Sequence, residues 1–215
     1  MPDKYRNFNE LSQNETSGID FSISVRRAKD AFAIVAPHGG GIEPGTSEIA
    51  DSIAAEEFSY YAFDGLKRSG NTDLHITSTR FDEPMCLIVI RHSDVVLTIH
   101  GEGSDGDGSP VFLGGLDDEL GPRVGAALET KGFDVRRHPD PQLQGRERKN
   151  ICNRGRSGKG VQLELSLALR KEFFRSLSRE GRKETTPRFL DFVNALRGAL
   201  NDEGYPCRAF GQGQG

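Results

Sequence analysis

The chain has 215 residues and a formal net charge of -4 at pH 7, and 35% of its residues are hydrophobic and 28% charged. These proportions are typical of a globular domain and exclude a disordered or fibrous chain. The length suits one domain that buries a core without disulfide staples. The overall charge by itself predicts no polyanionic partner.

The cysteines and the apolar runs exclude further classes of protein. Cys86, Cys152 and Cys207 are odd in number and irregularly spaced, which does not fit a disulfide framework. Because no C-x-x-C pair occurs, a thiolate zinc site is disfavoured. No run approaches the ~20 apolar residues of a membrane span, and residues 1–12 are too polar for a signal peptide. We expect a protein made in the cytoplasm that could still act outside the cell after lysis.

The apolar patterns predict a series of strands and helices after a polar segment, residues 1–20, whose start we expect to be poorly ordered. In chain order they predict strand 21–26, buried strand 31–36, helix 48–57, strand 60–63, a weaker strand 74–77, strands 85–90, 95–100 and 111–113, helix 117–131, strands 133–136 and 161–165, a helix to about 174, and helix 189–200. A glycine-rich tail, 206–215, is expected to be flexible.

Strands that alternate with helices predict an α/β fold. We therefore expect a single domain over residues 21–205, with a central mixed, mainly parallel sheet flanked by helices. The chain shows no internal repeat.

Four side chains suited to metal binding or proton transfer lie in or beside the predicted strands. His38 follows one buried strand, His100 ends another, and Glu164 lies within the run VQLEL. Glu43 comes five residues after His38, across three glycines that give the loop backbone freedom. Sites in open α/β sheets form at the carboxyl ends of strands. A catalytic zinc takes three nitrogen or oxygen ligands and keeps one open position, so His38, Glu43 and His100 are candidate ligands.

Glu164 is then the candidate general acid/base, which would take a proton from the attacking water and pass it to the leaving nitrogen. Alternatives stay open on sequence alone. A histidine at a strand end is commonly structural, and the alternation in 161–166 also allows Glu164 to face water. Of the remaining histidines, His75 and His92 are expected to be structural or exposed, and His75 is the better candidate for supporting a metal ligand.

The stretch 145–160, GRERKNICNRGRSGKG, is strongly basic on a net acidic chain. Its cations are Arg146, Arg148, Lys149, Arg154, Arg156 and Lys159, against the single acid Glu147. Arginine suits bidentate capture of carboxylates, so this stretch is a candidate substrate-binding loop. A solvated, mobile loop explains the composition equally well. Nucleic-acid binding is disfavoured because no aromatic residue offers a stacking platform.

Several segments resemble the poly-γ-glutamate hydrolase family of bacteriophages and their bacterial relatives. They are APHGGGIEPGTSEIA (36–50), YYAFDGLK (60–67), LHITSTRFDEP (74–84), TIHG (98–101), VFLGGLD (111–117) and NICNRGRSGKGVQLELS (150–166). The resemblance covers roughly residues 20–200. It implies a fold like that of the zinc carboxypeptidases, one zinc ion, and hydrolysis of the γ-amide bonds of poly-γ-glutamate.

The resemblance also implies roles for individual residues. His38, Glu43 and His100 fall on the family's ligand positions, and Glu164 falls on its general acid/base position. Asn153 and Arg154 resemble the Asn-Arg pair with which carboxypeptidases hold a substrate carboxylate. In those enzymes the pair precedes the second ligand histidine, whereas here it follows His100. Arg146 or Arg148 could serve instead.

Rival functions fit the same residues. A peptidoglycan amidase or peptidase, or an N-acyl amino acid deacylase, would use the same metal chemistry. A non-catalytic polyanion-binding protein would use only the basic stretch 145–160. We expect the poly-γ-glutamate polyanion as the partner, a monomeric protein, and no nucleic-acid or membrane partner.

Overall fold

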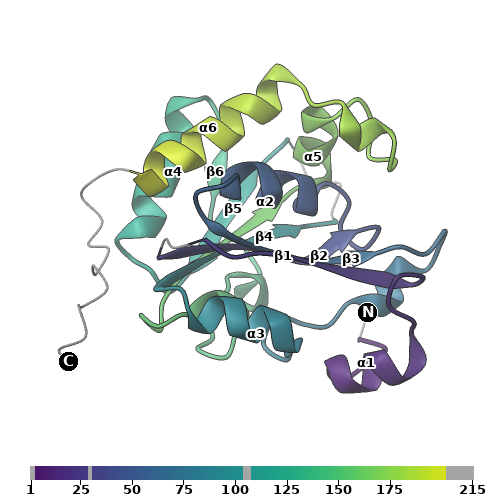
Figure 1. Cartoon of the computed structure of the whole chain (residues 1–215). Coiled ribbons are helices and arrows are strands. Elements are labelled where there is room, and N and C mark those ends of the chain that lie inside the picture. Colours follow the sequence, from purple (N-terminus) through teal and green to yellow (C-terminus); the bar gives the residue numbers. More distant parts are fainter. Residues whose placement is uncertain (1–2, 29–30, 104–107, 202–215) are drawn as a thin grey trace, which may run out of the picture.

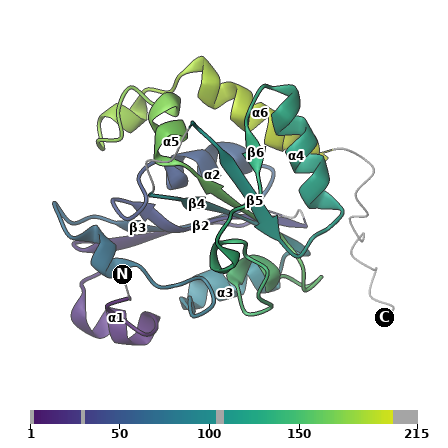
Figure 2. The same ribbon diagram turned by 180° about the vertical axis from the view of Figure 1, so that it is seen from behind.

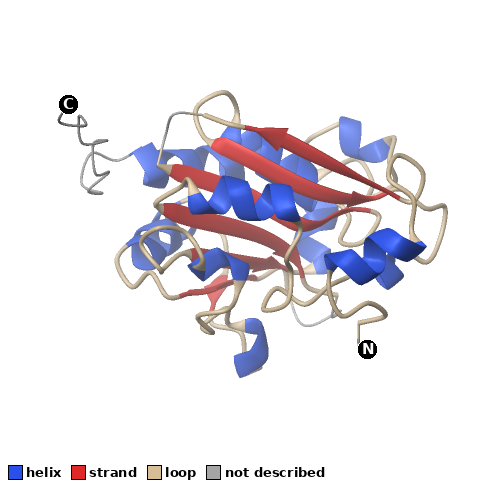
Figure 3. Cartoon of the chain, turned by 60° about the horizontal axis from the view of Figure 1, so that its bottom comes forward, coloured by secondary structure: helices blue, strands red, loops and turns tan. Residues whose placement is uncertain are grey.

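A seven-stranded mixed sheet runs through the middle of the protein and carries helices on both faces (Figures 1 and 2). The computed structural model describes residues 3–28, 31–103 and 108–201. The strands are β1 (Phe21–Arg26), β2 (Phe32–Gly40), β3 (Ser59–Gly65), β4 (Val95–Gly101), β5 (Val111–Gly115), β6 (Val135–Arg136) and β7 (Val161–Leu165). Their spatial order is β1-β3-β2-β4-β7-β5-β6. Figure 3 brings the underside of the molecule forward and shows the strands running side by side.

The pairing of the strands confirms the predicted α/β class with a mixed, mainly parallel sheet. The pairs β2–β3, β2–β4, β4–β7 and β5–β6 are parallel, and the pairs β1–β3 and β5–β7 are antiparallel. Strands β2, β4 and β7 therefore lie next to one another in one direction, and their carboxyl ends meet at one edge of the sheet. This is the place where α/β sheets bind ligands.

Helices cover both faces of the sheet, and one face carries more of them than the other. They are α1 (Phe8–Asn14), α2 (Thr46–Ala54), α3 (Pro84–Arg91), α4 (Leu120–Thr130), α5 (Leu167–Phe173) and α6 (Pro187–Asn201). Helices α2, α4, α5 and α6 pack on one face and α1 and α3 on the other (Figure 1). Strand β2 feeds both cores, with Ile34 facing the first layer and Val35 the second. Burial on both faces explains its unbroken apolar run.

The prediction of a strand over 85–90 is wrong, because this segment forms helix α3. Pro84 occupies the first turn, and the Glu83 side chain accepts hydrogen bonds from the backbone N–H groups of Met85 and Cys86. The buried positions Cys86, Val89 and Ile90 follow helical spacing. A short apolar run does not distinguish a strand from a buried helix, and here the capping residues decide.

Two further segments differ from the sequence prediction. Residues 74–77 form no strand, since a 3₁₀ turn over Asn71–Leu74 leads into an irregular loop. The polar N-terminal segment contains the unpredicted helix α1, capped by Asn7, and Leu11 buries its side chain in the core on the α3 side. The predicted tail 206–215 and Cys207 lie outside the described residues. No helix in the described part of the chain is long and apolar enough to cross a membrane.

Candidate metal centre

The loop after β2 brings His38 and Glu43 together. The pairing of β2 with β3 shifts register between Ala36 and Gly39, and such a bulge re-aims the side chains at this point. The Glu43 backbone N–H then donates to the His38 carbonyl over 2.9 Å and closes the loop. Gly40 has a φ of 63°, and a Cβ there would lie 2.6 Å from the Gly65 carbonyl oxygen. The loop therefore requires glycine at this position.

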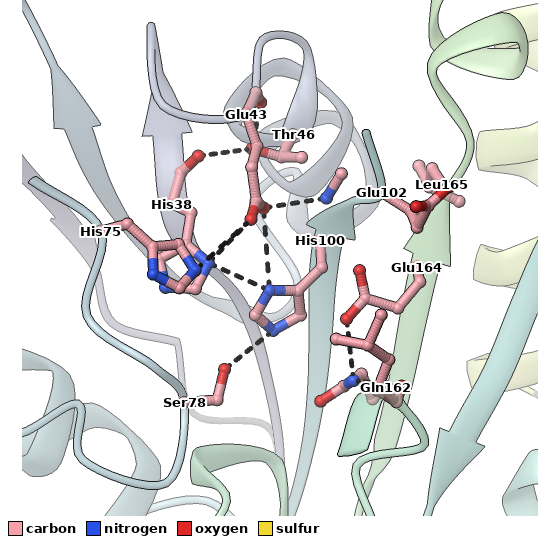
Figure 4. A network of polar contacts seen from close by, with 12 residues as sticks. His38, Glu43, Thr46, His75, Ser78, His100, Glu102, Gln162, Glu164 and Leu165 are labelled. Carbon is pink, nitrogen blue, oxygen red and sulfur yellow. Dashed lines mark hydrogen bonds and ion pairs between the residues drawn. The ribbon is translucent and has the colours of Figure 1, made fainter. Parts of the chain in front are cut away.

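His100 and Glu164 come from the two neighbouring parallel strands. They are direct partners in the register of β4 and β7, so their side chains leave the sheet on the same face. His100 is 3% exposed and Glu164 7% exposed. Strand β7 is buried throughout, which excludes the alternative of a solvent-facing Glu164. Figure 4 shows Glu164 beside His100.

Two imidazole nitrogens and one carboxylate converge on a single point. His38 Nδ1 lies 3.0 Å from Glu43 Oε1 and 3.2 Å from His100 Nδ1. His100 Nδ1 lies 3.7 Å from Glu43 Oε2 (Figure 4). The outer nitrogens are engaged elsewhere, because His38 Nε2 donates to the Ile76 carbonyl over 2.9 Å and His100 Nε2 contacts Ser78 Oγ at 3.3 Å.

This arrangement fits a metal ion. A ligating histidine normally binds a carbonyl or a polar side chain with its other nitrogen, as His38 and His100 do here. Two nitrogen ligands and one carboxylate form the donor set that zinc takes in catalytic sites. The facing pair of Nδ1 atoms therefore has the chemistry of two ligands of one cation.

The surroundings give the two carboxylates of the site opposite properties. Burial opposes the charge of Glu43, but His38 and His100 outweigh it and hold the pKa of the Glu43 carboxyl below its ordinary value. Glu164 differs: burial, and then the charge of Glu43, raise its pKa well above the ordinary value. The Glu164 Oε1 atom accepts a hydrogen bond from Gln162 Nε2 over 3.0 Å, which orients the carboxyl group. One carboxylate thus suits a ligand and the other a proton carrier.

His75 also faces the candidate metal centre. Its ring lies 4.0 Å from the His38 ring, centroid to centroid, and its Nε2 atom lies 4.0 Å from Glu43 Oε1. On the other side, His75 Nδ1 contacts Asp3 Oδ1 at 2.7 Å. The neighbouring His38 and burial lower the pKa of His75 to about 4. His92, in contrast, is exposed at the C-terminal end of α3, where it contacts the carbonyl of Ile88.

The predicted substrate-binding residues separate into two groups. Arg148 and Arg154 line a cavity of about 360 Å³ together with Thr79 and Lys149. Thr79 is next in sequence to Ser78, the residue that contacts His100, so one lining residue of this basic cavity adjoins a residue of the candidate metal centre in sequence.

The second group is held by protein contacts. The Asn153 amide nitrogen donates to the carbonyls of Gly145 and Glu147, and its oxygen accepts from two backbone N–H groups. Arg146 contacts the Gly115 carbonyl and Asp118. A substrate role for Asn153 and Arg146 stays a prediction.

Arg170 of α5 links the three segments that carry the site, and nothing in the sequence singled it out. Its side chain is buried and donates three hydrogen bonds to backbone carbonyls. Nη1 reaches Pro44 and Nη2 reaches Glu102, each over 2.9 Å, and Nε reaches Leu165 over 3.2 Å. These carbonyls follow Glu43, His100 and Glu164 within two residues. The guanidinium therefore fixes the spacing between the segments that carry Glu43, His100 and Glu164.

Comparison with known proteins places the chain in a family. Residues 5–195 match the poly-gamma-glutamate hydrolase family. The chain belongs to this family. It is 38% identical over 209 residues to the SPbeta prophage-derived UPF0714 protein YoqZ of Bacillus subtilis (strain 168), covering 96% of this chain and 74% of that protein.

Two solved structures of similar sequence share the fold. A bacteriophage poly-gamma-glutamate hydrolase is 37% identical, with a TM-score of 0.89, over 93% of this chain and 97% of that one. A structure described as YndL in a zinc-free apo form is 33% identical, with a TM-score of 0.88, over 95% of this chain and all of that one. Membership of the poly-gamma-glutamate hydrolase family confirms the resemblance drawn from the sequence.

Proposed function

We propose that the protein hydrolyses the γ-glutamyl amide bonds of poly-γ-glutamate with one zinc ion bound by His38, Glu43 and His100. Glu164 is the general acid/base. One observation carries the proposal: the Nδ1 atoms of both histidines face each other and the Glu43 carboxylate, directly beside a buried glutamate. Family membership and the relative described as zinc-free support the substrate and the metal.

Zinc in such a site polarises an amide carbonyl and makes a water molecule more acidic. The chain's own contribution is the placement and protonation of Glu164. Because burial raises the pKa of Glu164 well above its ordinary value, the carboxylate can accept a proton from the attacking water and release it to the leaving nitrogen. The hydrogen bond from Gln162 aims one oxygen, and the register with His100 keeps the carboxyl group next to the metal ligands.

The basic cavity supplies the substrate contacts in this proposal. Poly-γ-glutamate carries a free carboxylate on every unit, and Arg148, Lys149 and Arg154 gather positive charge in one cavity of a net acidic protein. Arg154 is anchored by a hydrogen bond of 3.0 Å from Nη1 to the Phe81 carbonyl, which presents the guanidinium in a fixed orientation. A fixed guanidinium binds a carboxylate with little loss of conformational freedom.

Turnover and metal content of Glu164→Gln test this assignment together. We expect the variant to keep its zinc, measured by elemental analysis, and to hydrolyse poly-γ-glutamate about 10²–10⁴-fold more slowly. The matched control is Glu129→Gln, because Glu129 is an exposed residue of α4. Full activity of Glu164→Gln would contradict the proposal. Hydrolysis of peptidoglycan fragments or N-acyl amino acids in place of the polymer would keep the mechanism and change the substrate.

A further inference from the structure

His75 approaches the metal centre from the loop between β3 and α3. Its ring is tilted by 35° against the His38 ring, and its Nε2 atom points toward Glu43 (Figure 4). The separation of 4.0 Å between Nε2 and Glu43 Oε1 is too long for a hydrogen bond. The His75 side chain is 35% exposed, whereas that of His38 is 2% exposed. His75 therefore occupies the solvent side of the site.

Asp3 decides which nitrogen of His75 carries the proton. The Asp3 carboxylate is 3% exposed and accepts from His75 Nδ1 over 2.7 Å. It also accepts from the Thr77 backbone N–H over 2.7 Å and from Arg80 Nη2. A carboxylate surrounded by donors in this way accepts only, so Nδ1 of the imidazole carries the hydrogen. His75 Nε2 then presents a lone pair toward the Glu43 carboxylate.

A lone pair and a carboxylate that face each other repel, and either a cation or a bridging water molecule between them relieves the repulsion. One donor atom each from His38, Glu43 and His75 lies within 4.8 Å of the others. Two ligands at about 2.0–2.2 Å from one ion are separated by at most about 4.4 Å, so the 4.0 Å between His75 Nε2 and Glu43 Oε1 suits two ligands of one ion.

We propose that His75 Nε2 is a fourth protein ligand of the metal bound by His38, Glu43 and His100, and that Asp3 holds it in the ligating tautomer. The inference rests on the proposed function, because it assumes the same metal. Through the hydrogen bond from His75 to Asp3, it gives the polar N-terminal segment an indirect part in metal binding. Zinc sites can expand to five ligands, so a fourth protein ligand leaves room for substrate chemistry.

Metal binding without substrate tests the proposal. Zinc affinity is measured against a competing chelator, and the coordination number is read from the visible absorption of the cobalt-substituted protein. We expect His75→Ala to weaken zinc binding about 100-fold or more, and Asp3→Asn to weaken it about 10–100-fold. The cobalt bands of His75→Ala should lose intensity, and added imidazole should restore them. The control is His92→Ala, an exposed histidine, which should bind zinc like the wild type.

The outcomes separate this inference from the proposed function. If His75→Ala binds zinc within about threefold of the wild type and its cobalt spectrum is unchanged, His75 is not a ligand and the inference is overturned. The three-ligand site would then stand. If the wild-type protein itself binds no zinc, the metal in the proposed function fails as well. Thermal unfolding of each metal-free variant shows whether a loss of zinc affinity comes from misfolding. If His75→Ala misfolds, the zinc affinity of Asp3→Asn tests the inference, because this variant leaves the His75 imidazole in place.

Discussion

Replacement of Arg170 by methionine should loosen the proposed metal centre without removing any proposed ligand. The guanidinium donates to the carbonyls of Pro44, Glu102 and Leu165. Leu165 keeps a second donor, the Glu102 backbone N–H at 2.9 Å, so methionine removes the guanidinium as a donor to two part-buried carbonyls, those of Pro44 and Glu102. At about 1–3 kcal/mol for each lost partner, the variant should lose roughly 2–6 kcal/mol of unfolding free energy. Because methionine also removes the buried positive charge of the guanidinium, which is itself costly to bury, we expect a loss in the lower half of that range.

Two measurements separate general destabilisation from an effect on the site. Denaturant unfolding of the chelated protein gives the stability change, and competition with a chelator gives zinc affinity. Because Pro44 adjoins Glu43 and Glu102 lies two residues after His100, we expect Arg170→Met to weaken zinc binding about tenfold or more. Arg170→Lys should recover part of both losses.

Arg182→Met is the matched control for this experiment. Arg182 is also buried and donates to Glu48 and to the Leu177 carbonyl, neither of which adjoins a proposed ligand. It should lose stability and keep its zinc affinity. A loss below about 0.5 kcal/mol in Arg170→Met, with unchanged zinc affinity, would refute the assignment of Arg170 as a positioning residue.

Other substitutions probe the same region. Gly101→Ala would place a Cβ 2.6 Å from the Arg170 Cζ atom and should lower the unfolding free energy, measured with denaturant, by about 1–3 kcal/mol. The control Gly121→Ala, with open space around the new Cβ, should cost nothing. Equal effects of the two substitutions would contradict the close packing of Gly101 against Arg170. Glu164→Gln should stabilise the chelated protein at pH 8. In the unfolded chain the Glu164 carboxyl ionises with a pKa of about 4.3, whereas the raised pKa in the folded protein makes ionisation costly above that pH. The gain in melting temperature should therefore vanish near pH 4. A gain that does not depend on pH would contradict the raised pKa. Arg154→Ala should raise KM for poly-γ-glutamate with kcat largely kept, and unchanged kinetics at low substrate would remove Arg154 from the site.

The central strands and the positions of the four proposed catalytic and metal-binding residues could be predicted from local patterns. The runs at 31–36, 95–100 and 161–165 are buried on both faces, which gives a strong apolar signal. A histidine or glutamate that follows or interrupts such a run is conspicuous. Local sequence patterns do not predict the order of strands in a sheet, so the pairing of His100 with Glu164 in adjacent strands is known only from the structure.

The remaining parts of the site depend on contacts between distant segments. Asp3 reaches His75 across 72 residues, and a short polar segment at the start of the chain gives no local sign of this. Arg170 in the helix after β7 has the pattern of a solvated cation, and only tertiary packing buries its guanidinium against the end of β7 and two loops.

The basic stretch 145–160 shows the same limit of composition. Arg148 and Arg154 line one cavity, but Arg156 pairs with Asp94 and Arg146 contacts Asp118. The charge of the stretch was plain from the sequence. The different surroundings of its individual cations were not, because each side chain is placed by neighbours from other parts of the chain.

The size distribution of high-molecular-weight poly-γ-glutamate shows whether the protein cleaves this polymer and whether cleavage requires a metal ion. The polymer is incubated with the wild-type protein, with the protein after chelation, and with the chelated protein after zinc is returned. We expect the wild type to shorten the polymer, the chelated protein to leave it intact, and returned zinc to restore the shortening. Shortening that persists in the protein shown to be free of metal would contradict a metal-dependent mechanism. An intact polymer with zinc bound would contradict the proposed substrate.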